Sequence, residues 1–184
     1  MSEVSERYTT IADGLTARIE GVTPDRWLAP TPCSEWTARD LVVHVVGTHR
    51  RVMATLDGTE PVDVDPDDDL PKQWLVASGE VREALSDEAR ASKIVKARGG
   101  GSEQSFESLV GRLLCADTLL HTWDLARATG QDERLDPAAV SKSMEFLVPL
   151  DEAIRRPGGF AAKIAPTPDA DEQTRLLNFC GRAT

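Results

Sequence analysis

The spacing of apolar residues along the chain predicts a protein built from helices. In residues 4–19 the apolar side chains recur three and four positions apart, which is the spacing of one buried helical face. The same spacing predicts helices at 38–56, 71–91, 105–129 and 137–155. No segment shows the sustained alternation of a half-buried strand. We therefore predict an all-α fold, a four-helix bundle with an additional C-terminal helix.

Residues that favour helix ends support several of these boundaries. Thr37 followed three positions later by Asp40 resembles a capping box at the start of the second helix. Gly130 follows the fourth helix and is suited to a left-handed cap. Pro137 suits the first turn of the fifth helix, and Pro157 with the two glycines after it suits its end.

Two segments lack helical periodicity. The stretch 57–71 is rich in Asp and Pro and is predicted to be an exposed acidic loop. Three consecutive glycines at 99–101 indicate a hinge or a close-approach turn. We interpret 1–184 as a single domain, with a core bundle at about 1–132 and a C-terminal helix and tail at 133–184. The tail is expected to wrap the bundle.

Charge and cysteine content narrow the possible partners and the compartment. The chain has 21 Lys and Arg against 31 Asp and Glu, so its net charge is −10. This balance leaves no continuous basic patch, and we exclude nucleic acid as a partner. Three irregularly spaced cysteines are too few for a disulfide framework or a four-thiolate zinc site. With no signal segment and no membrane-length apolar run, we expect a cytoplasmic protein that does not bind membranes.

A cluster of polar residues interrupts the apolar face of the fourth helix. Asp117, His121 and Asp124 in CADTLLHTWDL are three and four apart, so they share a face. An unpaired buried carboxylate costs roughly several kcal/mol, so the cluster needs a compensating partner. One interpretation is a buried polar network in which these side chains bond one another or water. The other is a metal site, because a carboxylate and an imidazole one turn apart can bind one ion.

A zinc site with an open fourth position needs a third protein ligand, and the chain has three histidines. His44 and His49 lie five apart on the second helix and cannot easily serve the same site. Periodicity favours His49, which falls among apolar residues. His44 lies at the polar margin, beside Thr48 and Arg51. The residues alone leave this choice open.

Two stretches resemble a known family. PTPCSEWTARDLVVHVVG (30–47) and LLHTWDLARATGQD (119–132) are similar to the signature segments of the DinB-like superfamily. More closely, they resemble the metal-binding N-terminal domain of mycothiol-dependent maleylpyruvate isomerase. The tail, 156–182, resembles that of small single-domain members, so the resemblance covers nearly the whole chain. It implies a DinB-like helical bundle.

Carried over residue by residue, the resemblance implies that His44, Asp117 and His121 bind a divalent metal. Asp117 stands where the isomerase has Glu. We expect zinc, with nickel as an alternative occupant. Asp124 has no ligand counterpart in the family, and we expect it either to orient a ligand imidazole or to tie a helix end. Arg51, on the His44 flank, is a candidate to hold a carboxylate of a bound ligand, the alternative being an ordinary surface arginine.

Three more side chains near these motifs have two interpretations each. Trp36 and Trp123 are either walls of the site or plain core residues. Cys33 lies in the loop before the helix that carries His44, where it either approaches the site or is a buried, inert thiol. For all three we favour the structural interpretation.

The resemblance also implies a class of chemistry, in which mycothiol is the thiol cosubstrate. The 184 residues leave no room for the isomerase's separate C-terminal domain. We therefore expect a thiol-dependent transferase or detoxifying enzyme that acts on a small-molecule substrate. The alternative is a non-catalytic metal-bearing bundle that binds or senses a small ligand. DinB-like relatives pair through bundle faces, which makes a homodimer the expected assembly.

Overall fold

The computed structural model describes residues 2–96, 102–155 and 159–184. Helices account for most of them, which confirms the all-α fold. The chain divides into two compact units, Met1–Glu133 and Arg134–Thr184, and each is described by itself. The three glycines at 99–101, and Pro157 with Gly158, lie outside the described residues. The single domain and the wrapping tail stay predictions.

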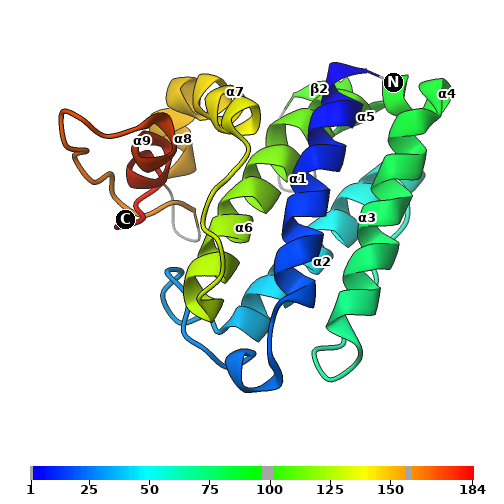
Figure 1. Ribbon diagram of the computed structural model, residues 1–184. Coiled ribbons are helices and arrows are strands. Elements are labelled where there is room, and N and C mark those ends of the chain that lie inside the picture. The colour runs from blue at the N-terminus through cyan, green and yellow to red at the C-terminus, as the bar shows by residue number, and fades with distance from the viewer. Residues whose placement is uncertain (1, 97–101, 156–158) are drawn as a thin grey trace. The chain divides into compact units, whose positions relative to one another are not determined.

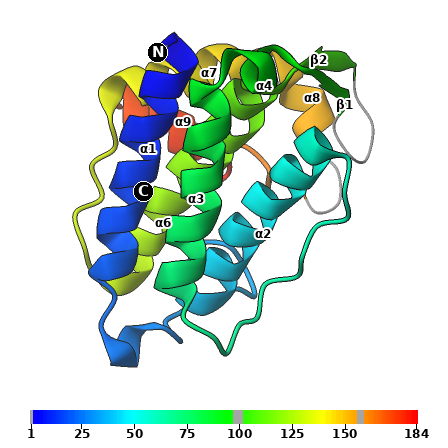
Figure 2. The ribbon, with the colours of Figure 1, turned by 90° about the vertical axis from the view of Figure 1, so that its right-hand side faces the viewer.

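Four long helices form the first unit. They are α1 (Glu3–Glu20), α2 (Ala38–Asp57), α3 (Leu70–Ser86) and α6 (Cys115–Thr129), seen from two directions in Figures 1 and 2. Both α1 and α2 pack against α3 and α6, so the four helices enclose one core. The largest fully buried side chains of this core are Trp74, Trp123, Tyr8 and Phe106. The predicted four-helix bundle is therefore present.

The capping residues act as the sequence predicted. The Thr37 side chain accepts a hydrogen bond from the backbone N–H of Asp40, and the Asp40 carboxylate accepts one from the backbone N–H of Thr37 at 2.9 Å. These bonds satisfy backbone groups that the first turn of α2 leaves without helical partners. Gly130 ends α6 with φ of 72°, in the left-handed region that glycine adopts without steric cost.

The helix predicted at 71–91 is wrong as a single element. Asp87 ends α3 in an extended conformation and starts a second helix, α4 (Glu88–Ser92). Its carboxylate accepts hydrogen bonds from the backbone N–H groups of Ala89 and Arg90, as an N-cap residue does. An N-cap residue inside the periodic stretch therefore divides it, although the apolar spacing continues.

The helix predicted at 105–129 is present, but it is not uniform. A short α5 (Phe106–Leu109) leads into a π-helical turn, Val110–Leu114, and then into α6. A π turn holds more residues than an α turn, so a helical wheel of constant angle does not hold across it. Gly111 lies in this turn against α1, where an added Cβ would be 3.1 Å from the Val4 side chain.

A small antiparallel hairpin was not predicted. It consists of β1 (Ile94–Lys96) and β2 (Glu103–Ser105), with Val95 opposite Gln104. Each strand has three residues, which is too short to show a measurable alternation of apolar and polar positions. The hairpin packs its buried Val95 into the unit while its neighbours in β1 remain exposed.

The acidic loop is confirmed as an irregular and mostly exposed segment. It is also anchored, because side chains of α2 and α3 donate hydrogen bonds to its backbone carbonyls. The pairs are Arg39 with Pro66, Arg50 with Asp63, and Gln73 with Asp65. The loop therefore has a fixed path along the bundle although it buries little apolar surface.

The second unit contains α7 (Pro137–Leu147), a 3₁₀ turn η3 (Val148–Leu150), α8 (Asp151–Ile154) and α9 (Glu172–Phe179). Within it α7 packs against α9. The helix predicted at 137–155 is wrong as a single element, because Pro149 lacks the backbone N–H that an α-helix needs there and the 3₁₀ turn separates α7 from α8. In the described parts of both units, none of the helices combines the length and apolar character needed to cross a bilayer.

Candidate metal centre

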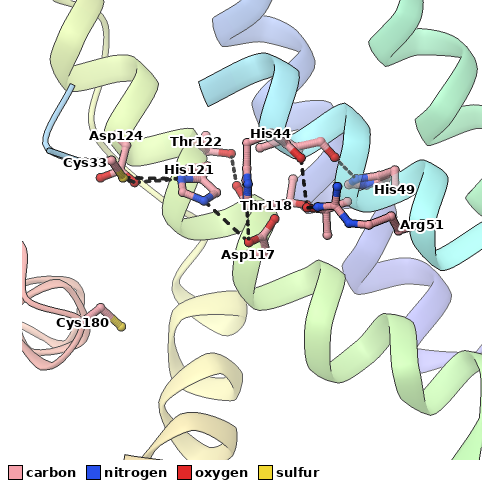
Figure 3. Close-up of polar contacts among 12 residues, drawn as sticks. Cys33, His44, His49, Arg51, Asp117, Thr118, His121, Thr122, Asp124 and Cys180 are labelled. Atoms are coloured by element: carbon pink, nitrogen blue, oxygen red, sulfur yellow. Dashed lines mark hydrogen bonds and ion pairs between the residues drawn. The ribbon is translucent and has the colours of Figure 1, made fainter. Parts of the chain in front are cut away.

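Two neighbouring helices of the first unit bring three predicted ligands together (Figure 3). His44 comes from α2, while Asp117 and His121 lie one turn apart on α6. Asp117 Oδ1 is 3.3 Å from His44 Nε2 and 3.6 Å from His121 Nε2. One donor atom from each side chain lies within 4.8 Å of the other two. The three residues named from the resemblance are therefore close enough for their donor atoms to bind one ion.

The spacing of these donor atoms fits a metal ion. Zinc bonds to nitrogen and oxygen of 2.0–2.2 Å place tetrahedral donors roughly 3.3–3.6 Å apart. The two distances from Asp117 Oδ1 fall at the ends of that range. The other carboxylate oxygen, Asp117 Oδ2, is buried and has no hydrogen-bond partner in the described structure. A cation beside this carboxylate would compensate an oxygen that is otherwise costly to bury.

The electrostatics of the cluster also favour a positive charge beside Asp117. Burial by itself would raise the pKa of Asp117, but the charge and hydrogen bond of His121, and then those of His44, bring it well below its usual value. Burial would likewise lower the pKa of His121, but the Asp117 carboxylate and hydrogen bonds to Asp117, Asp124 and Cys33 raise it well above 6.5. Asp117 is thus an ionised carboxylate that is stabilised by positive charge on its neighbours.

Asp124 supports His121 from the side opposite Asp117. Its side chain is fully buried, and its Oδ2 accepts a hydrogen bond from His121 Nδ1 at 3.0 Å. With Nδ1 carrying a proton toward Asp124, the Nε2 lone pair of a neutral His121 faces the Asp117 and His44 donors. This is how buried carboxylates orient the imidazole ligands of metals.

Trp36 is a wall of the site, contrary to the interpretation favoured from the sequence. Its ring centre is 4.6 Å from that of His44 and 5.8 Å from that of His121. The two imidazoles meet nearly edge to face, with centres 5.0 Å apart. Trp123, by contrast, is buried at 1 % exposure in the core of the bundle.

Cys33, like Trp36, lies at the site and is not the buried, inert thiol favoured from the sequence. It is half-buried, and its Sγ lies 3.3 Å from Asp124 Oδ2 and 4.0 Å from His121 Nδ1. The available signal was its position three residues before Trp36, in the loop that leads directly into the helix of His44.

His49, which periodicity favoured, is a core residue. It is fully buried, its Nδ1 donates to the backbone carbonyl of Val45 at 2.8 Å, and its ring packs against Trp74 and Tyr8. Burial lowers its pKa to about 4, so the ring is neutral. Among the described residues, the ligand clusters contain His44 and His121 but not His49.

Arg51 lies on the exposed flank of α2. Its guanidinium donates to Thr48 Oγ1 at 2.7 Å, and the Thr48 hydroxyl in turn donates to the backbone carbonyl of His44. A Cβ added to Gly47 would be 3.1 Å from the guanidinium, so the side chain folds back along the helix. It therefore leans toward the turn that carries His44. Its role in holding a ligand stays a prediction.

Comparison of the sequence with known proteins identifies the family of the chain. Residues 8–126 match the family described as the mycothiol maleylpyruvate isomerase N-terminal domain. Two proteins described as uncharacterized, from Mycobacterium tuberculosis strains CDC 1551 / Oshkosh and ATCC 25618 / H37Rv, are each 32% identical over 180 residues, covering 92% of both chains. No solved structure matches. The matched segment contains His44, Asp117 and His121, and the chain belongs to the mycothiol maleylpyruvate isomerase N-terminal domain family.

Proposed function

We propose that the protein is a metal-dependent enzyme that uses a low-molecular-weight thiol to transfer or detoxify a small electrophilic substrate. The observation that carries the proposal is the cluster of His44, Asp117 and His121, with donor spacings that fit zinc. Nickel suits the same donors. His44, Asp117 and His121 would hold the metal, and a bound zinc would lower the pKa of a water or thiol and so supply a nucleophile near neutral pH.

The protein's own residues have separate tasks in this proposal. Asp124 holds the Nδ1 proton of His121 and fixes the orientation of the ring. Trp36 lies against the two imidazoles and forms one wall of the site. Arg51 offers a positive charge on the His44 flank for a carboxylate of the thiol or substrate. Membership of the family supports mycothiol as the thiol, and three cysteines, which are too few for a disulfide framework, fit a reducing cytoplasm.

The test is a turnover screen with the purified, zinc-loaded full chain. Mycothiol is offered with a panel of small electrophiles, and loss of free thiol is followed over time. We expect metal-dependent consumption that is abolished in Asp117→Asn and retained in Asp13→Asn, a matched change at an exposed carboxylate of α1. Unchanged turnover in Asp117→Asn would refute the proposed mechanism. If no thiol reacts at any metal loading, and one ligand class raises the melting temperature, the protein is a binding module instead.

A further inference from the structure

The turn between Thr31 and Trp36 is built to hold one shape. The backbone N–H of Thr31 donates to the Trp36 carbonyl at 3.0 Å, and that of Trp36 donates to the Cys33 carbonyl at 3.1 Å. The Thr31 hydroxyl lies 3.1 Å from the Cys33 carbonyl. Within the turn Glu35 has φ of 72°, the left-handed region that residues other than glycine adopt at a cost. Its surroundings must therefore fix this conformation.

The turn delivers the Cys33 thiol to the carboxylate behind the metal centre. The S–H group donates to Asp124 Oδ2 at 3.3 Å, and the same oxygen accepts from His121 Nδ1 at 3.0 Å. His121 in turn directs its other nitrogen at Asp117. The three side chains thus form a continuous chain of contacts from the turn to the ligand set, which Figure 3 shows on one side of His121.

We propose that Cys33 is a positioning residue of the metal centre, an inference that rests on the proposed function. Two donors that converge on one oxygen restrict rotation of the Asp124 carboxylate, and this carboxylate orients His121. The turn also places Trp36 over His44. A single turn before α2 therefore constrains both imidazole ligands, His121 through a carboxylate and His44 by direct ring contact.

The test compares variants that separate hydrogen bonding from packing. Cys33→Val fills the space without a donor, whereas Cys33→Ser keeps a donor. Removing a direct hydrogen-bond partner of a ligand weakens metal binding by roughly 10- to 100-fold, so a partner one step further away should cost less, about 3- to 10-fold. We expect Cys33→Val to raise the Kd for zinc by that amount and Cys33→Ser to stay within about 2-fold of the wild type. Melting temperatures of the metal-free proteins confirm that each variant folds.

A double-mutant cycle shows whether the effect passes through Asp124. In the Asp124→Ala background the acceptor is gone, so Cys33→Val should no longer change the Kd. Cys180→Ala serves as the control because it removes a buried thiol outside the first unit, and it should leave the Kd unchanged.

Four results would overturn the assignment. Equal affinity in the wild type and Cys33→Val removes any positioning role, and a loss in Cys33→Ser as large as in Cys33→Val shows that the hydrogen bond is irrelevant. A thiolate-to-metal charge-transfer band in the cobalt-loaded protein, absent from Cys33→Ser, makes Cys33 a ligand instead. A folded wild-type protein that binds no metal refutes the proposed function together with this inference. Zinc binding that is insensitive to Cys33 refutes the inference alone.

Discussion

At the scale of single residues, two histidines on one helix have opposite settings. His44 is partly exposed and faces a carboxylate, whereas His49 is enclosed by aromatic rings and bonds only backbone through its Nδ1. Burial lowers the pKa of His49 to about 4. His121 differs again, because its flanking carboxylates raise its pKa. These differences have a measurable effect on stability.

We predict that His49 makes the metal-free protein less stable in mild acid. Below pH 6.5 the unfolded chain takes up a proton at His49, whereas the folded chain excludes that proton until about pH 4. The free energy of unfolding therefore decreases as the pH is lowered from 6.5. Between pH 6.5 and 5 this amounts to about 2 kcal/mol. His121 does not contribute to the loss, because a raised pKa gives stability that is fully present below pH 6.5.

Urea unfolding at several pH values measures this dependence. The free energy of unfolding of His49→Gln should change much less than that of the wild type between pH 6.5 and 5, whatever the absolute stability of the variant. Equal pH dependence in the two proteins would show that His49 does not exclude a proton in the folded state.

The same residues show what sequence reasoning detects at the site. Apolar spacing correctly found that His49 is buried, but burial does not distinguish a ligand from a core residue. The motif resemblance pointed to His44, which the structure places beside Asp117 and His121. Cys33 and Trp36 were misjudged because a turn outside any periodic segment delivers them, and no local pattern reports where such a turn leads.

At the scale of elements, the helices are interrupted more often than the apolar spacing of the sequence indicates. Apolar spacing found all the long helices, since it records which face is buried. It did not find the interruptions at Asp87 and Pro149 or the π turn at Val110–Leu114, because apolar spacing records burial and not the backbone hydrogen bonds that end or widen a helix. The capping box at Thr37 was predicted correctly, since its signal lies entirely in neighbouring residues.

A glycine in the π turn, Gly111, should respond to substitution differently from Gly79, a glycine in the regular helix α3. In a helix interior, Gly→Ala usually stabilises by about 0.5–1 kcal/mol. Gly79→Ala on the exposed face of α3 should follow this rule, because nothing lies within 4 Å of its added Cβ. Gly111→Ala should destabilise, because the new methyl group would be 3.1 Å from Val4 and 3.2 Å from the Arg7 guanidinium. The midpoint of urea unfolding compares the two variants, and equal stabilisation by both would contradict the close approach of α1 to the π turn.

At the scale of the whole molecule, the candidate metal centre lies entirely in the first unit. Hydrogen bonds also join the end of α1 to the last residues of that unit. The Arg18 guanidinium donates to the Asp132 carbonyl at 2.9 Å, and the Gln131 amide donates to the Arg18 carbonyl at 2.8 Å. Both of these bonds join residues that precede Arg134, where the second unit begins.

We therefore predict that a fragment of residues 1–133 folds and binds metal as the full chain does. Circular dichroism should show a helical fragment with a cooperative melting transition, and its zinc Kd should agree with that of the full chain within about 3-fold, since no proposed ligand or supporting residue is lost. A fragment that is unfolded, or that is folded but binds no zinc, would show that residues 134–184 complete the core or the site.

We infer that His44, Asp117 and His121 hold one metal ion. Plasma mass spectrometry measures the zinc content of the purified full chain, loaded with zinc and freed of excess, beside that of His44→Ala and Asp117→Asn, with Asp13→Asn as the matched control. We expect about one zinc per chain in the wild type and in the control, and little or no zinc in both site variants. A wild-type protein that is folded but retains no added zinc, or site variants that retain as much zinc as the control, would contradict this inference.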